Sequence, residues 1–230
     1  EQCDELELAD IIVFNTCCIR ENAENHAFGN IGALKKLKKS KPNLLIAVGG
    51  CMTQEKGKTD VLKKKFPFID IMFGTLNLEE LGRLIELKKS RKKRVVEIRE
   101  KEGEIVEFDD AYRTSYPNAW VNIMYGCNNF CSYCIVPYVR GRERSRAADD
   151  IVREAEQLVA SGAKEIMLLG QNVNSYGTDN DSGVSFAKLL HRVSETGIER
   201  IRFMTSHPKD LSAELIDEMA HNPVLAPHLH

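Results

Sequence analysis

The chain has 230 residues, of which 43% are hydrophobic and 29% are charged, a composition typical of one large or two modest globular domains. No stretch reaches the roughly 20 apolar residues of a membrane span, and no signal peptide is recognisable, so neither a membrane protein nor a secreted one is expected. The net charge of −2 is unevenly divided: residues 1–94 hold 18 Lys and Arg against 13 Asp and Glu, and residues 95–230 hold 14 against 21. A basic half is compatible with a polyanionic partner but does not identify one.

The seven cysteines are clustered and odd in number, which does not suggest a disulfide framework. Without a secretory signal, metal or redox chemistry in a reducing cytoplasm is the better interpretation. Residue 1 is not Met, and residues 225–230 read as the beginning of another strand. We therefore expect a piece of a longer protein.

The first 94 residues alternate β-branched runs with amphipathic segments. This alternation predicts an N-terminal α/β domain built on a parallel sheet. The expected strands are 9–14, 44–48 and 69–73, and the expected helices are 21–39, 61–66 and 78–89.

Two of these strands end in cysteine, one at Cys17 and the other at Cys51. Ligand sites of open parallel sheets lie beyond the carboxyl ends of the strands, so both thiols are expected at one edge although they are 34 residues apart (51 − 17). The alternative is that both are small buried hydrophobic side chains. The residues alone leave this choice open.

Residues 95–116 are predicted to be a polar linker, with a hairpin that pairs 95–98 with 104–108 around Gly103. Residues 117–230 then repeat a strand–loop–helix pattern. Strands are expected at 119–124, 165–169 and 200–204, and helices at 147–161, 184–195 and 211–220. This repeat predicts the first part of a (β/α) barrel, whose active site lies at the carboxyl ends of its strands.

Three cysteines, Cys127, Cys131 and Cys134, follow the first of these strands in a C-x3-C-x2-C pattern. Three thiolates on a loop suit an iron–sulfur cube with one open iron. Structural zinc normally takes four ligands in two separated pairs, and the next histidine is His191. Chance placement of three thiols in eight residues is the poorest explanation, because such thiols are redox liabilities.

This motif at this place in a barrel resembles the radical S-adenosylmethionine superfamily. The resemblance implies that the open iron binds S-adenosylmethionine and that one electron cleaves it to methionine and a 5′-deoxyadenosyl radical. Tyr133 matches the aromatic position that lies by the adenine in that superfamily; its alternative is ordinary loop packing.

The combination of 15–17, 49–51, 126–137 and 140–146 resembles the methylthiotransferase family, and 15–24 resembles its MiaB-like branch, which modifies tRNA. The resemblance implies a second 4Fe–4S cluster, an auxiliary cluster, with Cys17 and Cys51 as two of its three ligands. The third is expected upstream of residue 1. Neither Cys3 nor Cys18 receives a role.

The implied reaction adds a methylthio group to C2 of N6-isopentenyladenosine next to the tRNA anticodon. It uses two 4Fe–4S clusters and S-adenosylmethionine, and the two clusters are expected to face one pocket. The implied partners are tRNA and a reducing donor such as flavodoxin or ferredoxin, and we expect a monomer. The alternatives are a relative that acts on another tRNA adenosine or a ribosomal-protein side chain, and a non-enzymatic zinc or RNA-binding module.

Several further residues are weaker candidates. Gln171, Asn172 and Asn174 follow the second barrel strand, and Ser206 and His207 follow the third; they are cofactor contacts or merely cap helices and hold loops. Arginines 140, 142, 144 and 146 either hold phosphate or the cofactor carboxylate, or pair with Asp149, Asp150 and Glu154. Lysines 35, 36, 38, 39 and 41 either touch RNA or form a solvated helix face. Trp120 is expected in the core.

Overall fold

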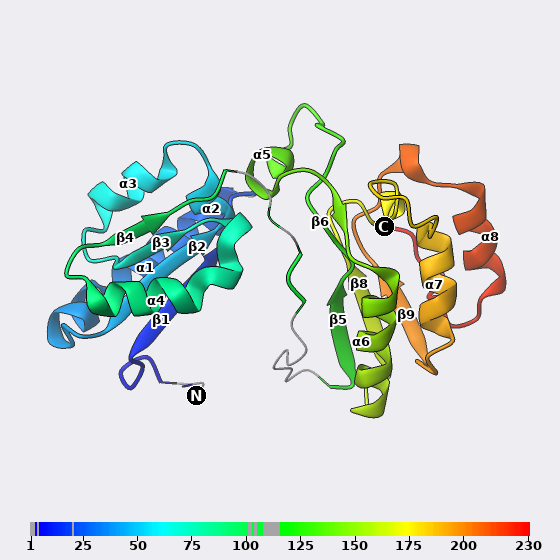
Figure 1. The fold of residues 1–230 in the computed structure, drawn as a ribbon, viewed down its shortest axis with the longest axis horizontal. Helices are drawn as coiled ribbons and strands as arrows, with labels where there is room; N and C mark the ends of the chain where they lie inside the picture. Colours follow the sequence, from blue (N-terminus) through cyan, green and yellow to red (C-terminus); the bar gives the residue numbers. More distant parts are fainter. Residues whose placement is uncertain (1–2, 4, 20, 101–102, 104, 108–115) are drawn as a thin grey trace. The chain divides into compact units, whose positions relative to one another are not determined.

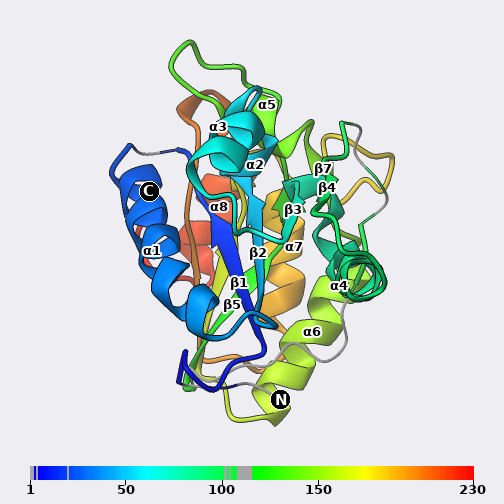
Figure 2. The ribbon, with the colours of Figure 1, turned by 90° about the vertical axis from the view of Figure 1, so that its left-hand side faces the viewer.

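A computed structural model describes residues 3, 5–19, 21–100, 103, 105–107 and 116–230 (Figures 1 and 2). Its contacts form two compact units, one of residues 1–104 with 130–141 and the other of residues 105–129 with 142–230. The domain boundaries inferred from the sequence stay a prediction. The predicted α/β class is confirmed, and each unit is described by itself below.

The first unit is built on a four-stranded parallel sheet whose strand order follows the chain. The strands are β1 (Ile11–Thr16), β2 (Leu45–Gly50), β3 (Ile71–Phe73) and β4 (Val95–Glu97). The helical segments are α1 (Glu21–Ser40), α2 (Cys51–Gln54), α3 (Lys58–Lys65), the 3₁₀ turn η1 (Thr75–Glu80), α4 (Leu81–Ser90) and α5 (Val136–Arg140).

Helices cover both faces of this sheet, as Figure 2 shows. Side chains alternate along β2: Ile46 and Val48 pack on one face with α1 and α3, and Ala47 packs on the other with Leu84 of α4. A strand buried on both faces reads as a continuous apolar run, which is why its sequence predicted a parallel strand.

The predicted linker hairpin is wrong in its first arm. Val95–Glu97 pairs with β3 in parallel, Ile71 opposite Val95, and Val95 is buried in the core beside α4. Short alternating runs pair equally well with any exposed sheet edge, and here β3 supplies that edge. Residues 105–107 form no strand, and 104 and 108 lie outside the described residues.

The second unit contains a three-stranded parallel sheet in the order β5–β8–β9. Its elements are β5 (Asn118–Asn122), β6 (Met124–Tyr125), β7 (Arg144–Ser145), α6 (Ala148–Ala160), β8 (Glu165–Leu169), the 3₁₀ turn η2 (Val173–Ser175), α7 (Phe186–Ser194), β9 (Arg200–Phe203), the 3₁₀ turn η3 (Pro208–Asp210) and α8 (Ala213–His221). Leu225 forms an isolated parallel bridge with Ile201, so the chain returns beside β9, but residues 225–230 do not form the strand expected from the sequence. The β6–β7 ladder is antiparallel and was not predicted.

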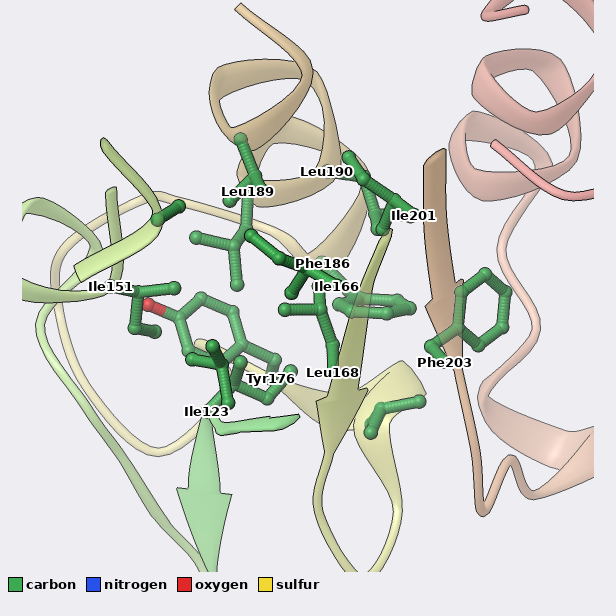
Figure 3. Close-up of a cluster of buried hydrophobic side chains, with 14 of the residues drawn as sticks. Ile123, Ile151, Ile166, Leu168, Tyr176, Phe186, Leu189, Leu190, Ile201 and Phe203 are labelled. Carbon is green, nitrogen blue, oxygen red and sulfur yellow. The ribbon is translucent and has the colours of Figure 1, made fainter. Parts of the chain in front are cut away.

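One face of this sheet forms the core of the unit (Figure 3). Ile166 and Leu168 of β8 pack with Leu189 and Leu190 of α7, and Phe186 meets Phe203 edge to face at 5.1 Å. Trp120 lies on the opposite face from its neighbours Ala119 and Val121 and is 49% exposed. The expectation that Trp120 is a core residue is therefore wrong, because period-two alternation turned it away from the helices.

Candidate functional site

Cys17 and Cys51 follow neighbouring strands at positions that the sheet register aligns. Thr16 lies opposite Gly50, so the two cysteines are the next residues of β1 and β2 beyond the paired ends. Gly50 has φ of 100°, and a Cβ there would lie 2.4 Å from the carbonyl oxygen of Thr16. Only glycine allows this close approach, which delivers Cys51 to the start of α2 as a buried residue with 2% exposure.

The thiol of Cys51 has two partners that the sequence did not reveal. Its sulfur accepts a hydrogen bond from the Cys18 thiol and another from Nε of Arg140 at 3.3 Å. The pKa of Cys51 falls to about 6, first because of the Cys18 hydrogen bond and then because of the Arg140 charge, with burial opposing both. The same hydrogen bond and burial raise the pKa of Cys18. Cys51 is thus held ready as a thiolate, the form that binds metal.

None of the three cysteines of the 127–134 loop forms a disulfide with another described cysteine. Cys127 is buried after β6, whereas Cys131 and Cys134 are half-buried and joined by a turn in which the amide of Cys134 donates to the carbonyl of Cys131 at 2.9 Å. Phe130 takes a left-handed φ of 45° just before that turn. Its ring packs edge to face on Tyr138 at 5.7 Å.

Among the described residues, no three His, Cys, Asp or Glu side chains converge as the ligands of one metal ion do. The thiolates of an iron–sulfur cube bind different irons and need not meet at one point. Three thiols in eight residues, none of them in a disulfide within the described chain, therefore fit a cube in number and in ligand softness.

The polar residues after β8 and β9 divide into two kinds. Asn172 is 1% exposed and fully used: its amide nitrogen donates to Ser175 at 3.0 Å and to Asp210 at 2.7 Å, and its oxygen accepts from the amide of His207 at 3.0 Å. It joins the loops after the two strands.

Gln171 Oε1, Asn174 Oδ1 and Ser206 Oγ, in contrast, are buried and have no hydrogen-bond partner within the described chain. Buried polar atoms are normally satisfied, so unpaired ones in the loops that follow the neighbouring strands β8 and β9 fit the binding of a polar ligand. The amino and carboxylate groups of S-adenosylmethionine have the matching donors and acceptors. Gln171 and Ser206 therefore fit a cofactor contact better than Asn172 does. Tyr133 is 89% exposed, so its side chain is available for stacking.

The arginine run does not act as one unit. Arg146 is 7% exposed and forms ion pairs with Glu107 and, at 2.7 Å, with Glu154. The guanidinium group of Arg146 is thus spent on carboxylates, the alternative that the sequence left open. Asp149 and Asp150 instead pair with Arg192 and Arg153. Arg140, in contrast, donates from its Nε to the sulfur of Cys51.

The five lysines of α1 and its end also divide. Lys38 pairs with Asp70 at 2.8 Å, and Lys41 donates to the carbonyl of Ala9 at 2.7 Å just before β1. The exposed remainder is Lys35, Lys36 and Lys39. Of the five lysines, these three are the ones whose side chains are exposed to solvent.

Two known protein families match this chain, one over its N-terminal part and the other over its C-terminal part. Residues 1–74 match the family described as "Uncharacterized protein family UPF0004", and residues 121–230 match the "Radical SAM superfamily". The chain is 56% identical over 223 residues to a tRNA-2-methylthio-N(6)-dimethylallyladenosine synthase of Clostridium tetani, covering 96% of the chain and 49% of that protein. The enzyme of the same name from Clostridium botulinum strain Hall is 54% identical over 228 residues, covering 99% and 51%.

The chain spans about half the length of the curated relatives it matches. Among solved structures, the radical S-adenosylmethionine methyltransferase TsrM from Kitasatospora setae, with tryptophan and a cofactor analogue bound, superposes with a TM-score of 0.59. It shares 14% identity, and the match covers 91% of this chain and 46% of TsrM. At that identity the likeness supports the fold alone.

Proposed function

This chain belongs to the radical S-adenosylmethionine methylthiotransferase family, and on that premise we propose that it is part of an enzyme that adds a methylthio group to C2 of N6-isopentenyladenosine next to the tRNA anticodon. The observation that carries the proposal is the pair of cysteine groups. One is the C-x3-C-x2-C loop, and the other is the aligned pair Cys17 and Cys51 at the edge of a parallel sheet.

The family implies S-adenosylmethionine and a 4Fe–4S cluster. In the proposal, Cys127, Cys131 and Cys134 hold that cluster as thiolates. When bound, cluster and cofactor supply the carbon-centred radical that removes an inert hydrogen. Gln171 and Ser206 offer their unpaired buried oxygens to the cofactor's amino-acid end, and the Asn172–Asp210 network keeps both loops in place. Exposed Tyr133 packs on the adenine ring.

A second, auxiliary 4Fe–4S cluster completes the proposed machinery. Cys17 and Cys51 supply two ligands from adjacent strand ends, and a third thiolate comes from a part of the protein outside these residues. The buried setting of Cys51 and its two sulfur hydrogen bonds support a ligand role over that of a simple apolar side chain. When bound there, such a cluster would supply the place where the sulfur to be transferred is held or methylated.

The proposed partners are the tRNA substrate and a reducing electron donor such as flavodoxin or ferredoxin. Exposed Lys35, Lys36 and Lys39 provide part of the electrostatic attraction to RNA. We further propose a monomer in the cytoplasm. No helix in the described part of the chain is long and apolar enough to span a membrane.

Mass spectrometry of bulk tRNA tests the proposal. Deleting the gene for the full-length protein should remove 2-methylthio-N6-isopentenyladenosine and leave N6-isopentenyladenosine in its place. Complementation with the full-length wild type should restore the methylthio nucleoside, and the Cys127→Ala variant should not. Unchanged methylthio content in the deletion strain would overturn the proposal. Loss of a methylthio group from a ribosomal-protein side chain in the deletion strain, with tRNA unchanged, would instead identify the alternative substrate class.

A further inference from the structure

Arg140 lies in an unusual position for an arginine, with its Nε donating to the sulfur of buried Cys51 at 3.3 Å. The two residues are 89 positions apart, so the contact arises from folding rather than from chain proximity. Arginine does not lose its proton in proteins, so this is a charged donor at every relevant pH.

The contact is built into the first unit. Helix α5 ends at Arg140 and packs against α2, the helix that begins at Cys51. Val136 and Val139 of α5 are buried, and the hydroxyl of Thr75 donates to the carbonyl of Val139, which fixes the turn next to Arg140. Gly141, with φ of 77°, then ends the helix. The packing of α5 against α2 and the hydrogen bond from Thr75 therefore fix the backbone that carries Arg140.

Within the described residues, the charge of Arg140 has no carboxylate partner at ion-pair distance. Over the residues that the structure describes, no ion pair involves Arg140, whereas Arg146 of the same run is held by Glu107 and Glu154. The positive charge therefore acts on the Cys51 sulfur, with the Cys18 thiol as that sulfur's other donor.

Hydrogen bonds to ligating sulfurs are one of the means by which proteins set cluster potentials. A cluster gains one negative charge on reduction, and a nearby cation stabilises that reduced form. We infer that Arg140 is a positioning residue for the auxiliary cluster, holding the Cys51 sulfur in a fixed orientation at the sheet edge and making the bound cluster easier to reduce. This role rests on the proposed second cluster.

Arg140 also lies only six residues after Cys134 (140 − 134). The segment that carries two ligands of the S-adenosylmethionine cluster therefore ends in the residue that contacts a ligand of the other cluster. Loss of the Arg140 contact is expected to change the auxiliary cluster without removing any ligand of either.

A redox titration of the full-length protein tests the inference. In a background with Cys127, Cys131 and Cys134 replaced by Ala, anaerobic reconstitution should leave about four irons per chain, all in the auxiliary cluster. The midpoint potential, followed by electron paramagnetic resonance, should move to more negative values in Arg140→Gln. It should move less in Arg140→Lys, which keeps the charge and one donor. Arg153→Gln, which removes an exposed arginine of α6, should leave it unchanged.

An Arg140→Gln potential equal to that of Arg153→Gln would overturn the inference. A background protein that binds no iron would instead refute the second cluster itself, and the iron assay reports this separately from the potential. If Arg140→Gln fails to fold or to take up iron, a spectroscopic comparison of the wild type with Arg140→Lys tests the contact instead. Guanidino-nitrogen-15 arginine should give a hyperfine signal from the reduced cluster that Arg140→Lys lacks, and identical spectra of the two proteins would contradict the contact.

Discussion

The two cysteine groups are held in different ways. Cys17 and Cys51 extend from paired strands, so the register of a parallel sheet fixes their spacing, and Cys51 is buried under donors from Cys18 and Arg140. Cys131 and Cys134 lie half-exposed on a short turn next to an outward-facing Tyr133. A rigid edge suits a cluster that must keep its place, and an open turn suits one that must admit a cofactor. Substitutions that affect one group and not the other can test this difference.

The largest expected effect separates the groups by function. In full-length reconstituted protein, Cys127→Ala, Cys131→Ala or Cys134→Ala should abolish S-adenosylmethionine cleavage, measured as 5′-deoxyadenosine, because each removes a proposed ligand of the cofactor cluster. Cys17→Ala or Cys51→Ala should retain cleavage and lose methylthiolation of tRNA. Exposed Cys3 provides the control, and Cys3→Ser should retain both. Equal loss of cleavage in the two sets would refute the division of labour.

The next largest expected effect is on stability and concerns Gly50, at the edge of the parallel sheet where Cys17 and Cys51 lie. Gly50→Ala should lower the free energy of unfolding by about 2–4 kcal/mol, since it combines a left-handed φ with a Cβ 2.4 Å from a backbone oxygen. Gly57→Ala is the matched control: its φ is 83°, but no atom lies within 4 Å of the new Cβ, so about 1 kcal/mol is expected. Urea denaturation measures both. A Gly50 variant no less stable than the Gly57 variant would show that this edge is not tightly packed.

On the loop side, the pair Gln171 and Asn172 should respond in opposite ways. Asn172→Ala removes the 2.7 Å donor of half-buried Asp210 and the side-chain acceptor of the His207 amide, and should cost about 2 kcal/mol of stability. Gln171→Ala removes a buried oxygen that has no hydrogen-bond partner among the described residues, so stability should change little while S-adenosylmethionine binding to the reconstituted protein weakens about tenfold. Equilibrium dialysis and urea melts distinguish the two. Unchanged cofactor binding in Gln171→Ala would remove that residue from the site.

Sequence patterns sufficed for features with a local cause. Apolar runs of strand length located β1, β2 and β8, and the rule that ligand sites lie beyond strand ends brought Cys17 and Cys51 to one edge. They failed where the deciding neighbour is distant in the chain. Val95 pairs with Ile71 in the sheet and not with a second arm of the predicted hairpin. The sequence around position 140 likewise contains no pattern that predicts the hydrogen bond from Arg140 to Cys51.

Residue type alone also could not tell a used polar side chain from a free one. Gln171 and Asn172 are adjacent amides with the same chemistry, yet one is spent on Asp210 and the other has a buried oxygen unpaired. The alternating pattern of β5 likewise predicts that Trp120 lies on the opposite face of the strand from Ala119 and Val121, but it does not predict which of the two faces the helices cover. The packing of α6 and α7 determines which face is buried.

The smallest expected effect concerns Glu143, which lies in the arginine run 140–146 and is 6% exposed. Burial is the first cause that raises its pKa above the ordinary value of 4.5, although Ser175 and Thr178 donate hydrogen bonds to it. The folded state then binds more protons than the unfolded state above pH 4.5, so the free energy of unfolding falls as pH rises through that window. Glu143→Gln keeps an acceptor for Thr178 and removes the titration. Urea titrations across the window should therefore show a shallower decline in this variant, with its advantage over wild type growing with pH. Glu156→Gln, at an exposed position of α6, is the control and should show the same dependence of stability on pH as the wild type. If Glu143→Gln also showed the wild-type dependence, the Glu143 carboxylate would be well solvated in the folded protein and the prediction would be wrong.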